Sequence, residues 1–309
     1  MWQRRRQRRH ADLWVHMPRK PTVSWDVTVQ CDADFDRLRW FNLTALLLHA
    51  ALAITTLSIA NLGLTLQVYD TELNLTSERD GMYRLFPGAV VERGTLTVSV
   101  FVFLVDAVTA LFHAGYTLFF HKAYRRAIRR CMNPARWVEY GVTASLQSIV
   151  IAYLSGVVTS EPLVAIAVLV SCTMLFGLVQ EQYNRPRDAL TWRIANPLTR
   201  VLPFMCGFVP FGAAVGLVAR RFAETSTLEA VSPDGSVVQM PGFVYGIVAC
   251  ELALFACFPV IMLWQALSPP KRFITFEYAY ILCSLTSKAA LAIILISNVL
   301  YLDNNADLL

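Results

Sequence analysis

The sequence predicts an all-α integral membrane protein with seven transmembrane helices and a β-hairpin in the loop after the first helix. Two properties of the sequence carry this prediction. Hydrophobic residues make up 56% of the 309 residues, and the mean hydropathy of +0.47 is far above that of an ordinary soluble domain. These residues also gather in seven runs, each long enough to cross a bilayer.

The seven runs divide the chain into three parts. A basic segment at 1–37 precedes a seven-helix domain at 38–303, and a short outer tail follows at 304–309. The weakest boundary lies between the third and fourth runs, because only residues 155–162 separate them. The predicted spans are 40–63, 96–120, 135–157, 161–181, 198–219, 242–267 and 276–302.

Lysine and arginine concentrate in alternate loops. Nine lie in the first 40 residues, six in 121–136 and four in 185–200, and Lys271 and Arg272 follow the sixth span. The other loops are acidic or mixed, apart from Arg220 and Arg221. Because cytoplasmic loops carry an excess of Lys and Arg, we predict a cytoplasmic N-terminus and an extracellular C-terminus.

The long loop after the first span holds two β-prone stretches, at 64–69 and 89–100. We expect them to pair as a hairpin on the outer side. The same loop contains Asn74, Leu75 and Thr76, which match the pattern of an N-glycosylation acceptor. A chance match explains this short pattern equally well.

Lys288 stands in the middle of the last span and is the one Lys or Arg within it. A charged side chain at this depth costs at least a few kcal/mol unless it is paired, neutralised or modified. One explanation is a Schiff base to retinal, and Ser284, one turn earlier, could then bond the nitrogen. The alternatives are a lysine paired with a buried acid, or one that lines an aqueous path.

A retinal Schiff base needs a carboxylate to keep it protonated, and Glu139 is the candidate. Lys288 lies about twelve residues into its helix and Glu139 about five into its own, a depth difference of roughly 10 Å. Because side chains lean toward the N-terminus of a helix, Lys288 reaches toward Glu139 and closes about half of that gap. The alternative is that Glu139 is an interfacial acid paired with Arg136.

Together, the run Arg136-Trp137-Val138-Glu139-Tyr140, the run Ser284-Leu285-Thr286-Ser287-Lys288 and the inverted orientation resemble the heliorhodopsin family. The resemblance implies all-trans retinal on Lys288, Glu139 as sole counterion and Ser284 near the nitrogen. It also implies intramembrane histidines, which match His49 and His113, and a homodimer with an outer hairpin. Phe255, Phe258 and Trp264 on the sixth span resemble the aromatic wall of the family more loosely. The long basic N-terminal extension departs from the family pattern.

Further polar residues in the spans suggest a proton path. The candidates are Asp106, Glu251 and Glu277, with Thr143 and Gln147 on the same helix face as Glu139. Buried acids without an evident structural partner are functional candidates, and the two histidines could accept a proton. The alternative for all of them is structural hydrogen bonding between helices.

These observations predict a light-absorbing retinal photoreceptor in a plasma membrane or another cellular membrane. Photoisomerisation and loss of the Schiff-base proton would drive a conformational change, read by a cytoplasmic signalling partner or as light-gated passive conductance of H⁺. The alternative is a retinal-free seven-helix transporter or receptor in which Lys288 binds an anionic ligand. We expect no enzyme, metal site or nucleic-acid partner, because the chain shows no nucleophile or metal constellation and its positive residues lie in loops on one side.

Overall fold

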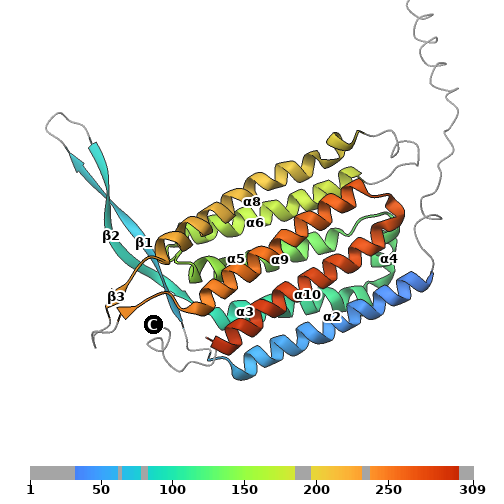
Figure 1. Cartoon of the computed structure of the whole chain (residues 1–309), viewed down its shortest axis with the longest axis horizontal. Coiled ribbons are helices and arrows are strands. Elements are labelled where there is room, and N and C mark those ends of the chain that lie inside the picture. Colours follow the sequence, from blue (N-terminus) through green and yellow to red (C-terminus); the bar gives the residue numbers. More distant parts are fainter. Residues whose placement is uncertain (1–31, 62–64, 78–82, 185–195, 232–236, 299–309) are drawn as a thin grey trace, which may run out of the picture.

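The computed structural model describes residues 32–61, 65–77, 83–184, 196–231 and 237–298, which form an elongated helical bundle with a hairpin at one end (Figure 1). A π-helical turn, Gly115–Phe119, extends α3, and a 3₁₀ turn, Pro270–Arg272, precedes α10. The elements are α2 (Asp32–Ile59), β1 (Leu66–Ser77), β2 (Tyr83–Leu96), α3 (Val98–Ala114), α4 (His121–Arg129), α5 (Pro134–Leu154), α6 (Ser160–Asn184), α8 (Pro197–Thr225), β3 (Ala230–Val231), β4 (Val237–Val238), α9 (Gly242–Leu267) and α10 (Phe273–Asn298).

The predicted membrane fold is confirmed as six helices of sufficient length and hydropathy to span a bilayer, together with α5 as a further helix of the bundle. Contacts join α2, α3, α5, α6, α8, α9 and α10 in a closed ring, in chain order, with α10 returning to α2. α5 is less apolar than the six because it carries buried polar side chains along its length. Many large apolar side chains of the other helices are exposed, as expected of surfaces that face lipid.

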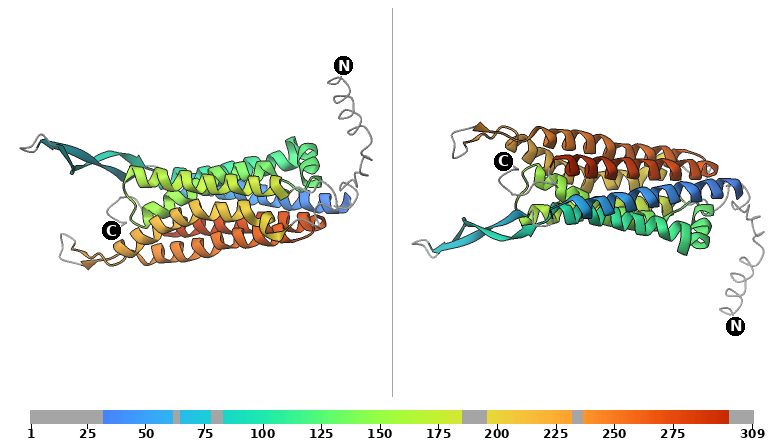
Figure 2. Two further views of the ribbon diagram at one scale, coloured as in Figure 1. Left: turned by 90° about the horizontal axis from the view of Figure 1, so that it is seen from above. Right: turned by 90° about the horizontal axis from the view of Figure 1, so that it is seen from below.

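The two ends of the bundle differ in character. The hairpin β1–β2 extends from one end, and α4, with Lys122, Arg125, Arg126 and Arg129, lies at the other (Figure 2). We call these the hairpin end and the basic end. The prediction that the basic end is cytoplasmic remains a prediction. The sequence-predicted tail at 304–309 and most of the basic segment at 1–37 lie outside the described residues, although α2 already begins at Asp32.

The predicted hairpin is present and is longer than expected. β1 and β2 pair antiparallel from Leu66 opposite Leu96 to Ser77 opposite Tyr83, with two irregularities in register. The predicted second strand ran to residue 100, but β2 ends at Leu96 because α3 begins at Val98.

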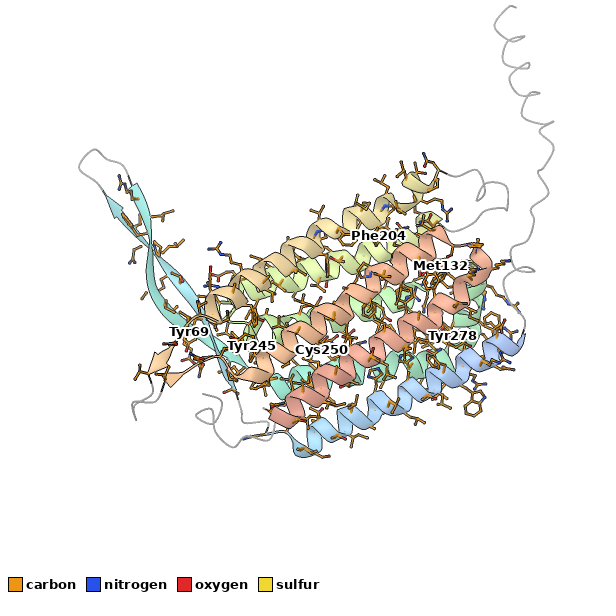
Figure 3. The ribbon with its side chains drawn as sticks, viewed as in Figure 1. Tyr69, Met132, Phe204, Tyr245, Cys250 and Tyr278 are labelled. Atoms are coloured by element: carbon orange, nitrogen blue, oxygen red, sulfur yellow. The ribbon has the colours of Figure 1, made fainter. Side chains whose placement is uncertain are left out.

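The base of the hairpin is fixed to the bundle near the turn between α5 and α6. The Tyr69 backbone nitrogen donates to the Val158 carbonyl over 3.0 Å, and Tyr69 lies at the foot of the hairpin (Figure 3). The Ser160 hydroxyl donates to Asp70, which also pairs with Arg93 at 3.1 Å. The hairpin is therefore anchored at its base.

Gly156 makes the tight turn from α5 to α6 possible. Its φ is +95°, a left-handed conformation that favours glycine. A Cβ at this position would lie 2.0 Å from the Thr225 Oγ1 of α8. The boundary between the third and fourth predicted spans was weak in the sequence because the connection is short. At this connection α5, α6 and α8 approach one another closely.

Candidate functional site

Lys288 lies buried at the centre of the bundle, with 4% of its surface exposed. Its Nζ donates to Glu139 Oε1 of α5 over 2.8 Å and to Thr109 Oγ1 of α3 over 2.7 Å. It also lies 5.3 Å from the centroid of the Tyr140 ring. The lean of Lys288 toward the N-terminus of α10 closes the difference in depth from Glu139 that the sequence indicated.

Arg136 does not pair with Glu139, so that alternative is not what the structure shows. Its guanidinium bridges Glu181 of α6 and Glu277 of α10 and lies 4.0 Å from the centroid of the Tyr280 ring. The two carboxylates and Arg136 are each at most 3% exposed. Glu139 therefore pairs with Lys288 and not with Arg136.

Further donors complete this cluster near the basic end. Asn133 donates its backbone nitrogen to Glu181 over 2.8 Å and its side-chain nitrogen to Glu277 over 2.6 Å. Tyr124 of α4 donates to Glu277 over 3.2 Å, and Gln265 of α9 donates to Glu181 over 3.3 Å. Buried ions are tolerated when they are paired and hydrogen-bonded, and the Arg136 cluster meets both conditions.

An apolar cavity lined largely by aromatic side chains adjoins Lys288, and small-molecule sites in proteins are commonly lined in this way. Phe204 of α8, one of its wall residues, lies in the half of the bundle away from the hairpin (Figure 3). The residues that line the cavity include Trp137, Tyr140, Thr143, Gln147, Phe176, Gly177, Phe204, Gly207, Phe208, Phe211, Phe255, Phe258, Met262, Ser284 and Lys288.

The wall of the cavity depends on a glycine. A Cβ at Gly177 of α6 would lie 2.3 Å from the Trp137 ring. That ring contacts the rings of Tyr140 and Tyr280 edge-on, with centroids 6.1 and 5.8 Å away. Gly177 therefore lets Trp137 lie flat between α6 and the tyrosines.

The two histidines lie on the α2–α3 side of Lys288 rather than in the cavity. His49 Nδ1 is 2.7 Å from Asp106 Oδ1, and His113 Nδ1 is 2.8 Å from Asn42 Oδ1. Their rings are nearly parallel, with centroids 6.0 Å apart. Asp106, which the sequence left without a partner, is thus paired across the helix interface.

These observations place a buried primary amine, a carboxylate and an aromatic cavity together in a ring of seven helices. The family model described as heliorhodopsin matches residues 38–300. The chain belongs to the heliorhodopsin family. The crystal structure of cyanorhodopsin N4075R from the cyanobacterium Tolypothrix sp. NIES-4075 matches with a TM-score of 0.53, 11% identity, and coverage of 87% of this chain and 95% of that one. That likeness shows a rhodopsin-like fold. No curated protein sequence matches.

Retinal is the chromophore that membership of the rhodopsins implies, and the residues present fit it. The cavity is apolar and largely aromatic, and Lys288 is one of its lining residues. Ser284 Oγ is buried at the same wall and has no hydrogen-bond partner of good geometry among the described residues. The described residues contain no group of three or more His, Cys, Asp or Glu side chains that could hold a metal.

The predicted aromatic wall needs one correction. Phe255 and Phe258 line the cavity, whereas Trp264 does not. The Trp264 side chain is 60% exposed, and its ring packs against Phe276 at 5.5 Å. Six residues after Phe258, it points about 240° around the helix from that residue, away from the cavity.

The remaining predicted acids lie apart from one another. Glu251 Oε2 accepts from Ser287 over 2.8 Å, and Gln147 donates to the same hydroxyl over 3.4 Å. Glu277 belongs to the Arg136 cluster, and Thr143 lines the cavity. Asp106, Glu251 and Glu277 thus each have different hydrogen-bonding partners, and the proton path through them stays a prediction.

Sequence reasoning missed Thr109 as a partner of Lys288 and Glu181 as a partner of Arg136. A signal for Thr109 was present, because Asp106, Thr109 and His113 are spaced as one polar face of a helix. No comparable pattern in the sequence pointed to Glu181.

Proposed function

We propose that this chain is a photoreceptor in which Lys288 Nζ carries all-trans retinal as a Schiff base and Glu139 is the counterion. One observation carries the proposal. The amine of Lys288 lies 2.8 Å from the Glu139 carboxylate, and Lys288 lines an aromatic cavity. Bound retinal would supply the absorption of visible light and an isomerisation.

Each neighbour of Lys288 has a defined role in this proposal. Glu139 holds a positive charge at Nζ, because an opposite charge within a few ångströms favours the charged form. Thr109 accepts a hydrogen bond from the free amine and so fixes the direction of the side chain before retinal binds, whereas the single N–H of a protonated Schiff base would go to Glu139. Phe255 and Phe258 form an apolar wall that excludes water from the chromophore.

The Arg136 cluster supports a signal at the basic end. Arg136 and Glu139 are three residues apart on α5 and so lie on one face. The cluster joins α5, α6 and α10, reaches α4 through Tyr124 and reaches α9 through Gln265. A change of charge in the Lys288–Glu139 pair would disturb this cluster, and movement of α4 would be available to a cytoplasmic partner.

Light-gated passive proton conductance is a second candidate, favoured by the buried acids. Asp106, Glu251 and Glu277 are each at most 1% exposed. Whole-cell currents under illumination test it. Currents that are absent, or that persist unchanged when all three acids are neutralised, would refute the conductance.

The hairpin supports the expected homodimer. Leu73, Leu75, Leu85, Phe86 and Val90 are exposed on its two strands, the first 70% exposed and Val90 67%. Such apolar side chains gain from burial against a second copy. A single species at the monomer mass, measured in detergent by light scattering, would count against the dimer.

The first experiment is a visible absorption spectrum of the protein with all-trans retinal, beside that of Lys288→Ala. We expect a visible band that Lys288→Ala abolishes. A folded wild-type protein without a band would refute the photoreceptor. It would instead favour the retinal-free transporter or receptor, in which Lys288, the one charged residue among those that line the cavity, binds an anion.

A further inference from the structure

Polar residues recur every seven positions along the facing sides of α2 and α3. Seven residues advance an α-helix by about 10 Å and return to nearly the same face. Such a series therefore forms one straight row on each helix. The residues of the two rows are Asn42, His49 and Thr56 on α2, and Ser99, Asp106 and His113 on α3.

Two cross-links between the rows fix their register. Asn42 pairs with His113 at 2.8 Å, and His49 pairs with Asp106 at 2.7 Å. Each step of seven residues up α2 matches a step of seven residues down α3, so the helices run antiparallel. The same register sets Thr56 opposite Ser99, within a turn of the hairpin end of both helices.

The row is buried, yet its outer part contains polar atoms without partners. Thr56 Oγ1, Ser99 Oγ, Asp106 Oδ2 and His49 Nε2 make no hydrogen bond to the described residues. All four residues are at most 1% exposed. An unsatisfied buried polar group costs about 1–3 kcal/mol, and buried water is the usual partner of such groups. Four of them on one interface indicate a hydrated row.

The directions of the side chains shorten the gap between the His49–Asp106 pair and the level of Thr56 and Ser99. Side chains lean toward the N-terminus of their helix. Asp106 therefore leans toward the hairpin end, and Thr56 leans back toward Asp106. A gap of about 10 Å along the axis is thus reduced to a distance that a few water molecules span.

The row also touches the candidate site. Thr109, which accepts from Lys288 Nζ over 2.7 Å, is one turn from Asp106 on α3. Both are 0% exposed. Asp106 is therefore a carboxylate one helical turn from the hydrogen-bond partner of Lys288, and it is not among the residues that line the cavity.

We propose that Asp106, His49, Thr56 and Ser99 form a hydrated proton pathway from Lys288 to the hairpin end. When a proton leaves Nζ, the N–H bond breaks and an O–H bond forms at Asp106 Oδ2, by way of water beside Thr109. The Asp106 proton then passes to water along Thr56 and Ser99 and leaves at the hairpin end. This inference rests on the proposed function for the source of the proton.

The hydration is tested without light or chromophore by cysteine accessibility in sealed vesicles. Thr56→Cys and Ser99→Cys are treated with a charged, membrane-impermeant thiosulfonate applied at the hairpin end. The controls are Ala53→Cys and Val98→Cys, equally buried positions at similar depth with apolar side chains, 6% and 1% exposed. We expect reaction at 56 and 99, and none at the controls beyond that of the parent protein. Reaction at 56 and 99 as slow as at the controls would overturn the proposal.

The direction of proton release is tested with a pH-indicating dye on the hairpin side of the same vesicles after a flash. Asp106→Asn should slow release roughly 100-fold, as expected for loss of a positioned proton acceptor, and Thr56→Val should also slow it. Thr44→Val is the matched control, since Thr44 is an exposed threonine of α2 whose hydroxyl bonds the Trp40 carbonyl.

The two proposals fail in different ways. Wild-type protein with a Lys288-dependent visible band, but release unaffected by Asp106→Asn, overturns the pathway and leaves the photoreceptor intact. A missing visible band refutes the photoreceptor, while the cysteine test still decides whether the row is hydrated.

Discussion

Three glycines of the bundle form a graded series that tests how the cavity wall is packed. A Cβ at Gly177 would lie 2.3 Å from the Trp137 ring, and one at Gly207 would lie 3.0 Å from Phe176 Cβ. A Cβ at Gly212 would have nothing within 4 Å. Alanine at these positions therefore adds the same methyl group against three different surroundings.

The expected energies follow from those distances. Ordinary contact begins at 3.4 Å, so Gly177→Ala must displace the Trp137 ring from 2.3 Å by about 1.1 Å. Overpacking of this kind costs about 1–3 kcal/mol, against a gain of up to about 1 kcal/mol from replacing glycine in a helix. We expect a net loss of about 1–2 kcal/mol for Gly177→Ala, a change near zero for Gly207→Ala and a small gain for Gly212→Ala.

The assay is equilibrium unfolding of the three variants in mixed micelles, with the absorption spectrum of each recorded beside it. Because Trp137 lines the cavity, Gly177→Ala should also shift the visible band. Gly212→Ala should leave the band in place. Equal stability of Gly177→Ala and Gly212→Ala would show that Trp137 does not pack as described.

Three further outcomes follow from the structure. Arg136→Gln leaves two buried carboxylates unpaired and should cost about 3–5 kcal/mol of unfolding free energy; thermal unfolding should show a smaller loss at acid pH, where the carboxylates are protonated, and a loss independent of pH would contradict this. The Ser160 hydroxyl, with Arg93 contributing less, lowers the pKa of Asp70. The ionised Asp70 carboxylate therefore stabilises the fold fully at pH values above the ordinary pKa of a carboxyl group, and this stabilisation is lost as pH falls through the lowered pKa. Thermal unfolding of Asp70→Asn should lack this pH dependence. Phe258→Leu should shift the visible band whereas Trp264→Leu should not, and the reverse result would place the tryptophan in the cavity.

The bilayer made much of the fold predictable from the sequence. Apolar runs long enough to cross it locate most helix ends within about four residues, although α2 begins eight residues before its predicted span and α8 ends six residues after its own. The lean of helical side chains predicted that Lys288 reaches Glu139. Both arguments use properties of a single helix. For the same reason, β-prone stretches indicated the hairpin and left its register and length open.

Interactions between helices were less predictable. Asp106 appeared to lack a partner because His49 belongs to another helix, 57 residues away in the sequence. The sequence also could not show that Arg136 turns to Glu181 and Glu277 rather than to Glu139. Trp264 was assigned to the cavity because the sixth span is rich in aromatic residues. The position of a residue around α9, however, decides which way its side chain faces.

The close α5–α6 turn has a consequence for how the chain enters a membrane during synthesis. α5 has Arg136 and Glu139 among its buried residues and is less apolar than the six helices that are long and apolar enough to span a bilayer, whereas α6 is strongly apolar. Charged and polar side chains make the insertion of a helix into a bilayer less favourable, so we expect α5 to insert poorly alone. The few residues of the Gly156 turn tether α5 to α6. We therefore expect the two helices to enter the bilayer together as one hairpin, because insertion of the strongly apolar α6 favours that of the more polar α5.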